Sequence, residues 1–229
     1  MSNTERYWAV IPAAGAGKRM QSDIPKQYLQ INGKPIIEYT LEVFTKHPDI
    51  EAVIVAISDT DEYWNELPVS RHPKVKTTEG GIERCHSVMN CLDYLSDIAD
   101  ESDWVLVHDA ARPCLKSTDI DKLINNVSAT DGGLLALPVR DTMKRSNDRH
   151  VSETVSREGL WHALTPQMFR LHNLQLALKA VIDSGELVTD ESLAMERAGY
   201  RPLLVEGRPD NIKVTHNVDL YLATLYLTS

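Results

Sequence analysis

Residues 7–20 of the 229-residue chain read YWAVIPAAGAGKRM, and this stretch decides the fold. Its first residues, 7–11, are an apolar run that predicts a buried strand. A loop of small residues and two glycines follows, ending in Lys18 and Arg19. Glycine lets the backbone approach a ligand closely, and exposed backbone N–H groups bind anions. Because open α/β sheets bind ligands beyond the carboxyl ends of their strands, the stretch predicts a phosphate site.

The loop fits neither of the two common phosphate motifs. A dinucleotide fingerprint, G-x-G-x-x-G, needs glycine where this chain has Met20. A Walker A loop needs glycine and then serine or threonine at the positions of Pro12 and Arg19. The plain alternative is a tight turn from strand to helix with two surface cations.

Three further apolar runs, at 52–57, 104–107 and 134–137, are typical of parallel strands covered on both faces. Apolar residues at helical spacing lie between them and at the C-terminus, in the segments 36–43, 88–95 and 218–225. A short strand is expected at 203–205. The alternation of strands and helices predicts an α/β sheet with right-handed crossovers.

The segment from Thr142 to Glu158 breaks this rhythm, because Val151 and Val155 are nearly its only aliphatic residues. It is too long for an ordinary connection in a compact domain. Composition slightly favours a mobile surface loop over a protruding β-arm that would be buried against a second subunit. No repeat or linker marks a second domain, so we expect one domain over residues 1–229.

The charge balance limits the partners. Lys and Arg number 24 and Asp and Glu 33, a formal net charge of −9, which disfavours a protein that coats nucleic acid. No apolar run approaches the about 18 residues of a membrane span. Cys85, Cys91 and Cys114 contain no C-x-x-C pair and leave one residue over in any disulfide scheme. We therefore expect a cytoplasmic protein that binds no membrane.

Two further segments carry residues suited to an anionic ligand. Pro25 fixes a turn that could direct Lys26 toward the first loop, although a lone lysine is usually a solvated charge. Gly80 and Gly81 precede a helical pattern that contains Ser87. This second segment is equally compatible with close backbone approach to a ligand and with a plain turn.

Asp109 follows the strand at 104–107, where a carboxylate can meet a ligand hydroxyl or a metal. The alternative is a surface ion pair with Arg112, and strand-end position favours the functional interpretation. His108 is expected to pack or to donate hydrogen bonds rather than to act as a base. Lys213, between Ile212 and Val214, would project to the opposite face of an extended segment, either along the surface or to a bound anion.

Together these motifs resemble the 2-C-methyl-D-erythritol 4-phosphate cytidylyltransferase family over nearly the whole chain. The resemblance lies in the segments 12–20, 25–28, 80–87, 108–113, 138–144, 160–167, 189–191 and 210–215. It implies a Rossmann-like, mostly parallel sheet flanked by helices, with a β-arm at 139–158 that protrudes and forms a homodimer. It further implies transfer of CMP from CTP to the substrate phosphate, with release of pyrophosphate and use of Mg²⁺.

The resemblance also assigns roles to individual residues. Arg19 and Lys26 match positions that stabilise the transition state, and Arg157 and Lys213 match positions that hold the substrate phosphate. Thr142 matches a further substrate contact, and the arm residues serve the partner subunit's site. Asp109 matches a residue near the ribose and substrate hydroxyls, and direct metal ligation by it is left open. Ile82 departs from a position that is often polar. The implied nucleotide-binding residues are Ala13, Ala14, Gly15, Gly17, Lys26, Gly81, Ser87 and Asp109.

Two other functions stay open at this point. A ribitol-5-phosphate cytidylyltransferase would share the CTP loop and the arm. A catalytically silent CTP-binding regulator would share the loop but would not need the three cations Arg19, Lys26 and Lys213.

Overall fold

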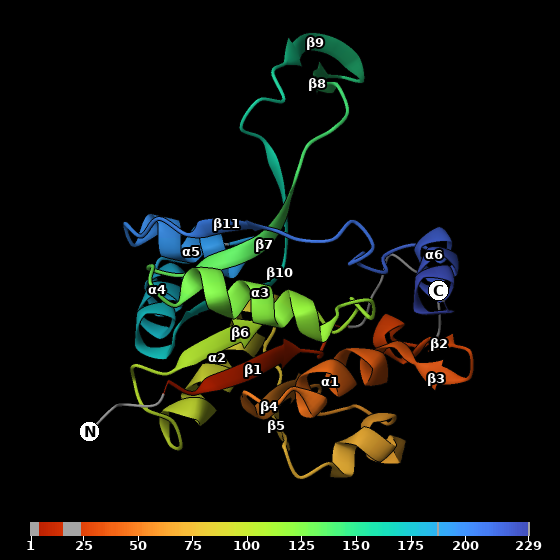
Figure 1. The fold of residues 1–229 in the computed structure, drawn as a ribbon, viewed down its shortest axis with the longest axis vertical. Coiled ribbons are helices and arrows are strands. Elements are labelled where there is room, and N and C mark those ends of the chain that lie inside the picture. The colour runs from red at the N-terminus through yellow and green to blue at the C-terminus, as the bar shows by residue number, and fades with distance from the viewer. Residues whose placement is uncertain (1–4, 16–23, 187, 229) are drawn as a thin grey trace.

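The computed structural model describes residues 5–15, 24–186 and 188–228. Their main feature is a seven-stranded sheet in the order β11-β7-β10-β6-β1-β4-β5 (Figure 1). The strands are β1 (Tyr7–Pro12), β4 (Ile50–Ile57), β5 (Val75–Glu79), β6 (Trp104–Val107), β7 (Gly133–Pro138), β10 (Trp161–Arg170) and β11 (Leu203–Glu206). Strand β10 runs antiparallel to both neighbours, and the other pairs are parallel. The predicted mostly parallel α/β sheet is confirmed.

Helices cover both faces of the sheet, because successive side chains of a strand point to opposite faces. Ala9 and Ile11 of β1 belong to one core cluster, together with residues of α1 (Ile36–Lys46) and α3 (Ser117–Val127). Val10 belongs to the other, with residues of α2 (Arg84–Ser96), α4 (Leu171–Asp183) and α5 (Glu191–Arg197). The apolar run at 7–11 is therefore buried on both faces, as predicted.

A smaller third cluster lies beside the sheet, where α6 (Asn217–Thr228) covers a short hairpin formed by β2 (Gln30–Ile31) and β3 (Lys34–Pro35). Its buried members include Ile31, Val214 and Ala223. The apolar stripe of α6 that the sequence showed points outward, since Val218 is 62% exposed and Tyr221 64%.

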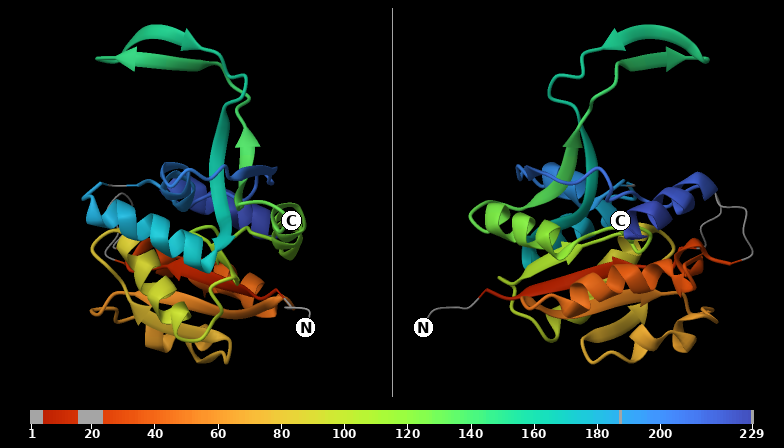
Figure 2. Two further views of the ribbon diagram at one scale, coloured as in Figure 1. Left: turned by 90° about the vertical axis from the view of Figure 1, so that its left-hand side faces the viewer. Right: turned by 45° about the vertical axis from the view of Figure 1, so that its right-hand side comes forward.

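Residues 142–158 are not an irregular loop: they contain a hairpin of β8 (Met143–Asn147) and β9 (His150–Val155). Asp148 and Arg149 both have positive φ, of 48° and 67°, as a two-residue hairpin turn of type I′ requires. The hairpin stands well away from the main sheet (Figure 2), and nearly all of its side chains are exposed. A two-stranded hairpin is only marginally stable alone in water.

No helix among the described residues combines the length and the apolar character needed to cross a membrane.

Candidate active site

A cavity of about 420 Å³ opens at the carboxyl ends of β1 and β6. This is the edge at which open α/β sheets bind ligands. Residues from five separate segments line the cavity: Pro12, Ala13, Ala14, Gly15, Lys26, Gln27, Gly81, Ile82, Glu83, Arg84, Ser87, Asp109, Ala110, Ala111 and Lys213. The three cations and two carboxylates in this lining make the cavity locally positive in a chain of net charge −9.

Two backbone loops form one wall of the cavity, and their contact explains the paired glycines. A Cβ added to Gly80 would lie 2.1 Å from the Cβ of Ala14, so a side chain there would force the loops apart. A Cβ on Gly81 would lie 2.2 Å from that of His86. The Gly81 N–H donates to Ser87 Oγ at 3.0 Å, which fixes the second loop on the first turn of α2. The first loop is held by Gln27, whose Nε2 donates to the Ala13 carbonyl at 2.7 Å.

Asp109 is the electrostatic centre of the site. Its Oδ1 accepts from Arg84 Nε at 3.2 Å, and its Oδ2 lies 3.2 Å from Arg112 Nε and 3.0 Å from Lys213 Nζ. Burial alone would raise the pKa of Asp109, but Arg84, Lys213 and Arg112 together hold it well below its usual range. Asp109 is therefore ionised. Its pairing with Arg112 is buried, with 7% and 8% of the two residues exposed, so the surface-pair alternative is wrong.

Lys213 reaches Asp109 because its neighbours are anchored. Val214 is fully buried in the third cluster, and its N–H donates to the Ala111 carbonyl at 2.8 Å. The segment thus lies against the loop that follows β6, and Lys213 projects into the cavity. Of the two alternatives from sequence, the structure favours a lysine directed to an anion, here the carboxylate of Asp109.

His108 lies beneath this loop and is fully buried. Its Nε2 is 3.2 Å from the Arg112 carbonyl, which can only accept, so Nε2 carries the proton. Its Nδ1 then accepts from the Thr165 hydroxyl at 3.0 Å, and Thr165 Oγ1 accepts the N–H of Asp109 at 3.1 Å. Burial lowers the pKa of His108 to about 3. As expected from sequence, this histidine fixes the loop by hydrogen bonds rather than serving as a base.

Sequence reasoning missed the other half of this network. Both terminal nitrogens of Arg84 bind Glu191, at 2.5 and 3.1 Å, and Glu191 is 1% exposed. These residues are 107 positions apart in the sequence, so spacing alone did not reveal the pair. The available signal was the arginine that ends the Gly80–Arg84 motif.

The structure brings together most of the predicted site residues: Ala13, Ala14, Gly15, Lys26, Gly81, Ser87, Asp109 and Lys213 line the cavity. Ile82 lines it too, and the residue is 95% exposed. Arg19 and Gly17 lie outside the described residues. Thr142 and Arg157 are exposed at the base of the hairpin and do not line the cavity of their own chain. The Arg157 side chain donates to the Arg140 carbonyl.

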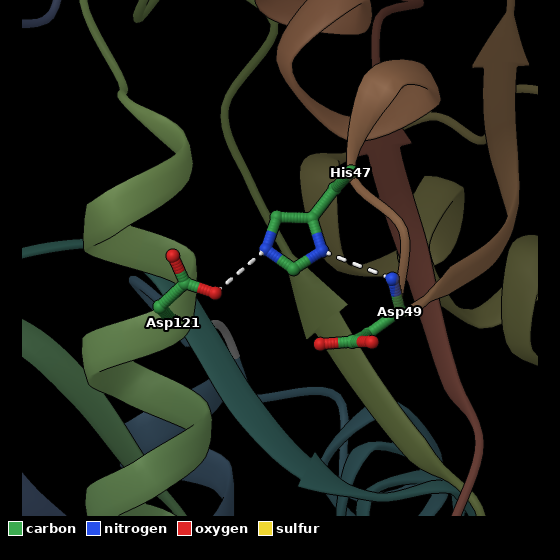
Figure 3. A group of neighbouring side chains, drawn as sticks. All are labelled: His47, Asp49 and Asp121. Atoms are coloured by element: carbon green, nitrogen blue, oxygen red, sulfur yellow. Dashed lines mark hydrogen bonds and ion pairs between the residues drawn. The ribbon is translucent and has the colours of Figure 1, made fainter.

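One cluster elsewhere in the described residues has the composition of a metal site, formed by His47, Asp49 and Asp121 (Figure 3). The Asp49 N–H donates to His47 Nδ1 at 3.2 Å, so the ring proton lies on Nε2, which donates to Asp121 Oδ1 at 3.2 Å. A metal on Nε2 would require a proton on Nδ1, where the Asp49 N–H already points. The cluster is therefore best explained as a hydrogen-bonded link between the end of α1 and α3.

Comparison with known proteins agrees with this architecture. The profile of the IspD family, 2-C-methyl-D-erythritol 4-phosphate cytidylyltransferase, matches residues 7–229. A relative of that name from Shewanella halifaxensis is 52% identical over 230 residues, covering 99% of this chain and 98% of the relative. One from Vibrio atlanticus is 51% identical over 221 residues, covering 96% and 94%.

Solved structures match equally broadly. A 4-diphosphocytidyl-2C-methyl-D-erythritol synthase has a TM-score of 0.86 at 38% identity and covers 99% of this chain and 100% of its own. The Francisella tularensis 2-C-methyl-D-erythritol 4-phosphate cytidylyltransferase has a TM-score of 0.86 at 36% identity, covering 97% and 100%. On the combined agreement of sequence, fold and site, this chain belongs to the 2-C-methyl-D-erythritol 4-phosphate cytidylyltransferase family.

Proposed function

We propose that this protein transfers CMP from CTP to 2-C-methyl-D-erythritol 4-phosphate, a step of isoprenoid precursor synthesis. Pyrophosphate and 4-diphosphocytidyl-2-C-methyl-D-erythritol are the products. The observation that carries the proposal is the cavity at the ends of β1 and β6, which two glycine-bearing loops line together with Lys26 and Lys213 in a chain of this family.

The chemistry needs no general base. An oxygen of the substrate phosphate, already ionised near neutral pH, attacks the α-phosphorus of CTP. The bond from that phosphorus to the bridging oxygen breaks, and its electron pair leaves with pyrophosphate. This agrees with a site whose one deeply buried histidine, His108, is held neutral by hydrogen bonds and burial.

Positioning and charge neutralisation are what the residues supply. An ammonium group has three N–H donors, and Lys213 is bonded through one of them to Asp109. The other two N–H groups can donate to the substrate phosphate while Asp109 keeps the lysine directed into the cavity. Lys26 lines the same cavity, and with Arg19 it would stabilise charge on the α-phosphate and the departing pyrophosphate.

Mg²⁺ fits this site in a limited way, because Asp109 Oδ2 already meets Arg112 and Lys213. Oδ1 meets Arg84 and retains a lone pair, so Asp109 is the residue that would join the triphosphate oxygens around the ion. When bound, Mg²⁺ would neutralise phosphate charge. The protein itself offers few ligands, as is common for Mg²⁺ held mainly by a nucleotide.

We further propose that residues 139–158 act as a dimerisation arm and that Thr142 and Arg157 complete the partner's site. Support comes from the hairpin's exposure and from the distribution of these two residues outside their own cavity. Lys26→Ala and Arg157→Ala chains, each inactive alone, should regain part of the activity when mixed. No recovery, with subunit exchange demonstrated by mass spectrometry of tagged chains, would refute the shared site. A cytoplasmic location remains part of the proposal.

Purified protein with CTP, Mg²⁺ and methylerythritol phosphate should release pyrophosphate, and ribitol 5-phosphate in its place should give far less. Exclusive use of ribitol 5-phosphate would make the chain a ribitol-5-phosphate cytidylyltransferase. CTP binding without pyrophosphate release from either substrate would make it a regulator.

A further inference from the structure

The pair formed by Arg84 and Glu191 lies between α5 and the cavity. Glu191 is the first residue of α5, and its two carboxylate oxygens accept from Arg84 Nη1 at 2.5 Å and Nη2 at 3.1 Å. This two-point contact fixes both the position and the plane of the guanidinium. The same guanidinium uses Nε to reach Asp109 Oδ1 at 3.2 Å. Arg84 is thus held on one side by Glu191 and holds Asp109 on the other.

Glu191 is itself rigidly placed, because the start of α5 is tied to β10. Asp190 caps the helix by accepting the Leu193 N–H at 3.1 Å. Gln167 of β10 donates to Asp190 Oδ2 at 2.9 Å and accepts the Ser192 N–H at 2.8 Å. The start of α5 is therefore capped and bound at two points to β10, which fixes the position of Glu191.

From this geometry we propose that Arg84 and Glu191 are positioning residues for the cytidylyl transfer: Glu191 orients Arg84, and Arg84 orients Asp109. The inference rests on the proposed function and adds to it a chain of contacts that leads from α5 to the reacting groups. Neither residue needs to touch the reacting atoms for this role.

These contacts matter because Asp109 also holds Lys213 in the cavity. Asp109 Oδ2 is shared by Arg112 and Lys213, whereas Oδ1 has Arg84 as its cationic partner. Lys213 contacts Asp109 Oδ2 and can at the same time donate to a substrate phosphate, so Asp109 must keep its own position to direct the lysine. Two arginines hold Asp109, and among the described residues Arg84 is the cation that contacts Oδ1, the oxygen with a lone pair to spare. Loss of Arg84's orientation would let the carboxylate rotate.

A purely structural ion pair is the competing explanation. Buried ion pairs are weak contributors to stability, because desolvation offsets their attraction. This pair also differs from an ordinary structural one in its location, since Arg84 lines the cavity and keeps 29% of its side chain accessible. The two explanations predict different kinetics.

The test is a mutant cycle of Glu191→Gln, Arg84→Met and the double mutant, followed by pyrophosphate release and by calorimetric titration with CTP. Each single change should lower kcat per CTP-binding site by about tenfold or more, as happens when a partner that orients a site residue is lost. Because Glu191 acts through Arg84, the double mutant should match Arg84→Met within about twofold. Arg84→Lys keeps the positive charge but not the two-point contact of the guanidinium, so it should not restore the rate.

Several outcomes would overturn the inference: unchanged kcat in the single mutants, additive losses in the double mutant, or full activity of Arg84→Lys. The double mutant leaves neither charge unpaired, so it keeps the test decisive if a single mutant fails to fold. Glu196→Gln makes the same chemical change on the exposed side of α5 and should behave like the wild type.

The cycle also separates this inference from the proposed function. If the wild type binds CTP but releases no pyrophosphate, the proposed function fails. The inference is then decided by CTP affinity, which should weaken by about tenfold in Glu191→Gln and equally in the double mutant. Unchanged affinity in that case would refute it, and a wild type that binds no CTP would refute both.

Discussion

Acidification should destabilise this protein in part through a buried side chain, His108. The ring is fully buried and accepts a hydrogen bond from Thr165 at Nδ1, so it has no place for a second proton. Burial lowers its pKa from 6.5 to about 3 in the folded state. In the unfolded chain the same imidazole takes up a proton near pH 6.5.

The magnitude follows from linkage between protonation and folding. Between pH 6.5 and about 3 the unfolded state holds one more proton at this position than the folded state, so the free energy of unfolding falls as the pH falls. Each pH unit in this window removes about 1.4 kcal/mol. At pH 4.5 the free energy of unfolding has fallen by about 3 kcal/mol. This is a large share of the free energy of unfolding of a typical domain, which is about 5–15 kcal/mol.

Urea unfolding at pH 7.5, 6.5, 5.5 and 4.5 measures this loss, with His108→Gln compared with the wild type. Glutamine can still donate to the Arg112 carbonyl but does not titrate. The difference between wild type and variant should therefore shrink by about 1.4 kcal/mol for each pH unit below 6.5. His162→Gln, at an exposed position of β10, should leave the wild-type pH dependence intact. Parallel curves for wild type and His108→Gln would refute the buried neutral histidine.

Three further predictions follow from the same contacts. Lys213→Ala should lower kcat by about 10²- to 10³-fold, the usual loss for a group that stabilises developing charge, while circular dichroism stays unchanged because Asp109 keeps both arginines. Lys46→Ala, at an exposed lysine, is its control, and wild-type kinetics for Lys213→Ala would contradict the assignment. Cys85, Cys91 and Cys114 are all buried, and burial raises the pKa of Cys114 to about 11, so none should react with a thiol reagent at pH 8 before unfolding. Labelling of the folded protein would show that the packing around them is wrong. Zn²⁺ should produce no rise in melting temperature that depends on His47, since both of its ring nitrogens are already bonded; a rise lost in His47→Gln would contradict the hydrogen bonds seen there.

The core strands could be predicted from sequence because β1, β4, β6 and β7 are continuous apolar runs buried on both faces. Strand β5 was missed because Lys76 and Thr77 are exposed at the edge of the sheet. Strand β10 was missed because it contains Pro166 and the polar residues Thr165 and Gln167, which are buried through tertiary hydrogen bonds. Helices α3, α4 and α5 were also not anticipated.

The candidate site, like the fold, could be predicted only in part. The loops after β1 and β6 were predictable, because position at a strand end can be read from sequence. The ion-pair network around Asp109 was not, since Arg84, Glu191 and Lys213 are brought together only by the fold. The exposure of the apolar stripe of α6 could not be predicted for a related reason. Helical periodicity identifies an apolar face but does not show whether another element covers it.

The central claim is that this cavity joins CMP to a sugar-alcohol phosphate, and pyrophosphate release measures it most directly. Purified protein is given CTP and Mg²⁺ with 2-C-methyl-D-erythritol 4-phosphate, and the same mixture with ribitol 5-phosphate is run beside it. We predict pyrophosphate and 4-diphosphocytidyl-2-C-methyl-D-erythritol in equal amounts from the first mixture, formed about 10²- to 10³-fold more slowly by Lys213→Ala. Absence of pyrophosphate above background from the first mixture, from protein shown to bind CTP, would contradict the claim.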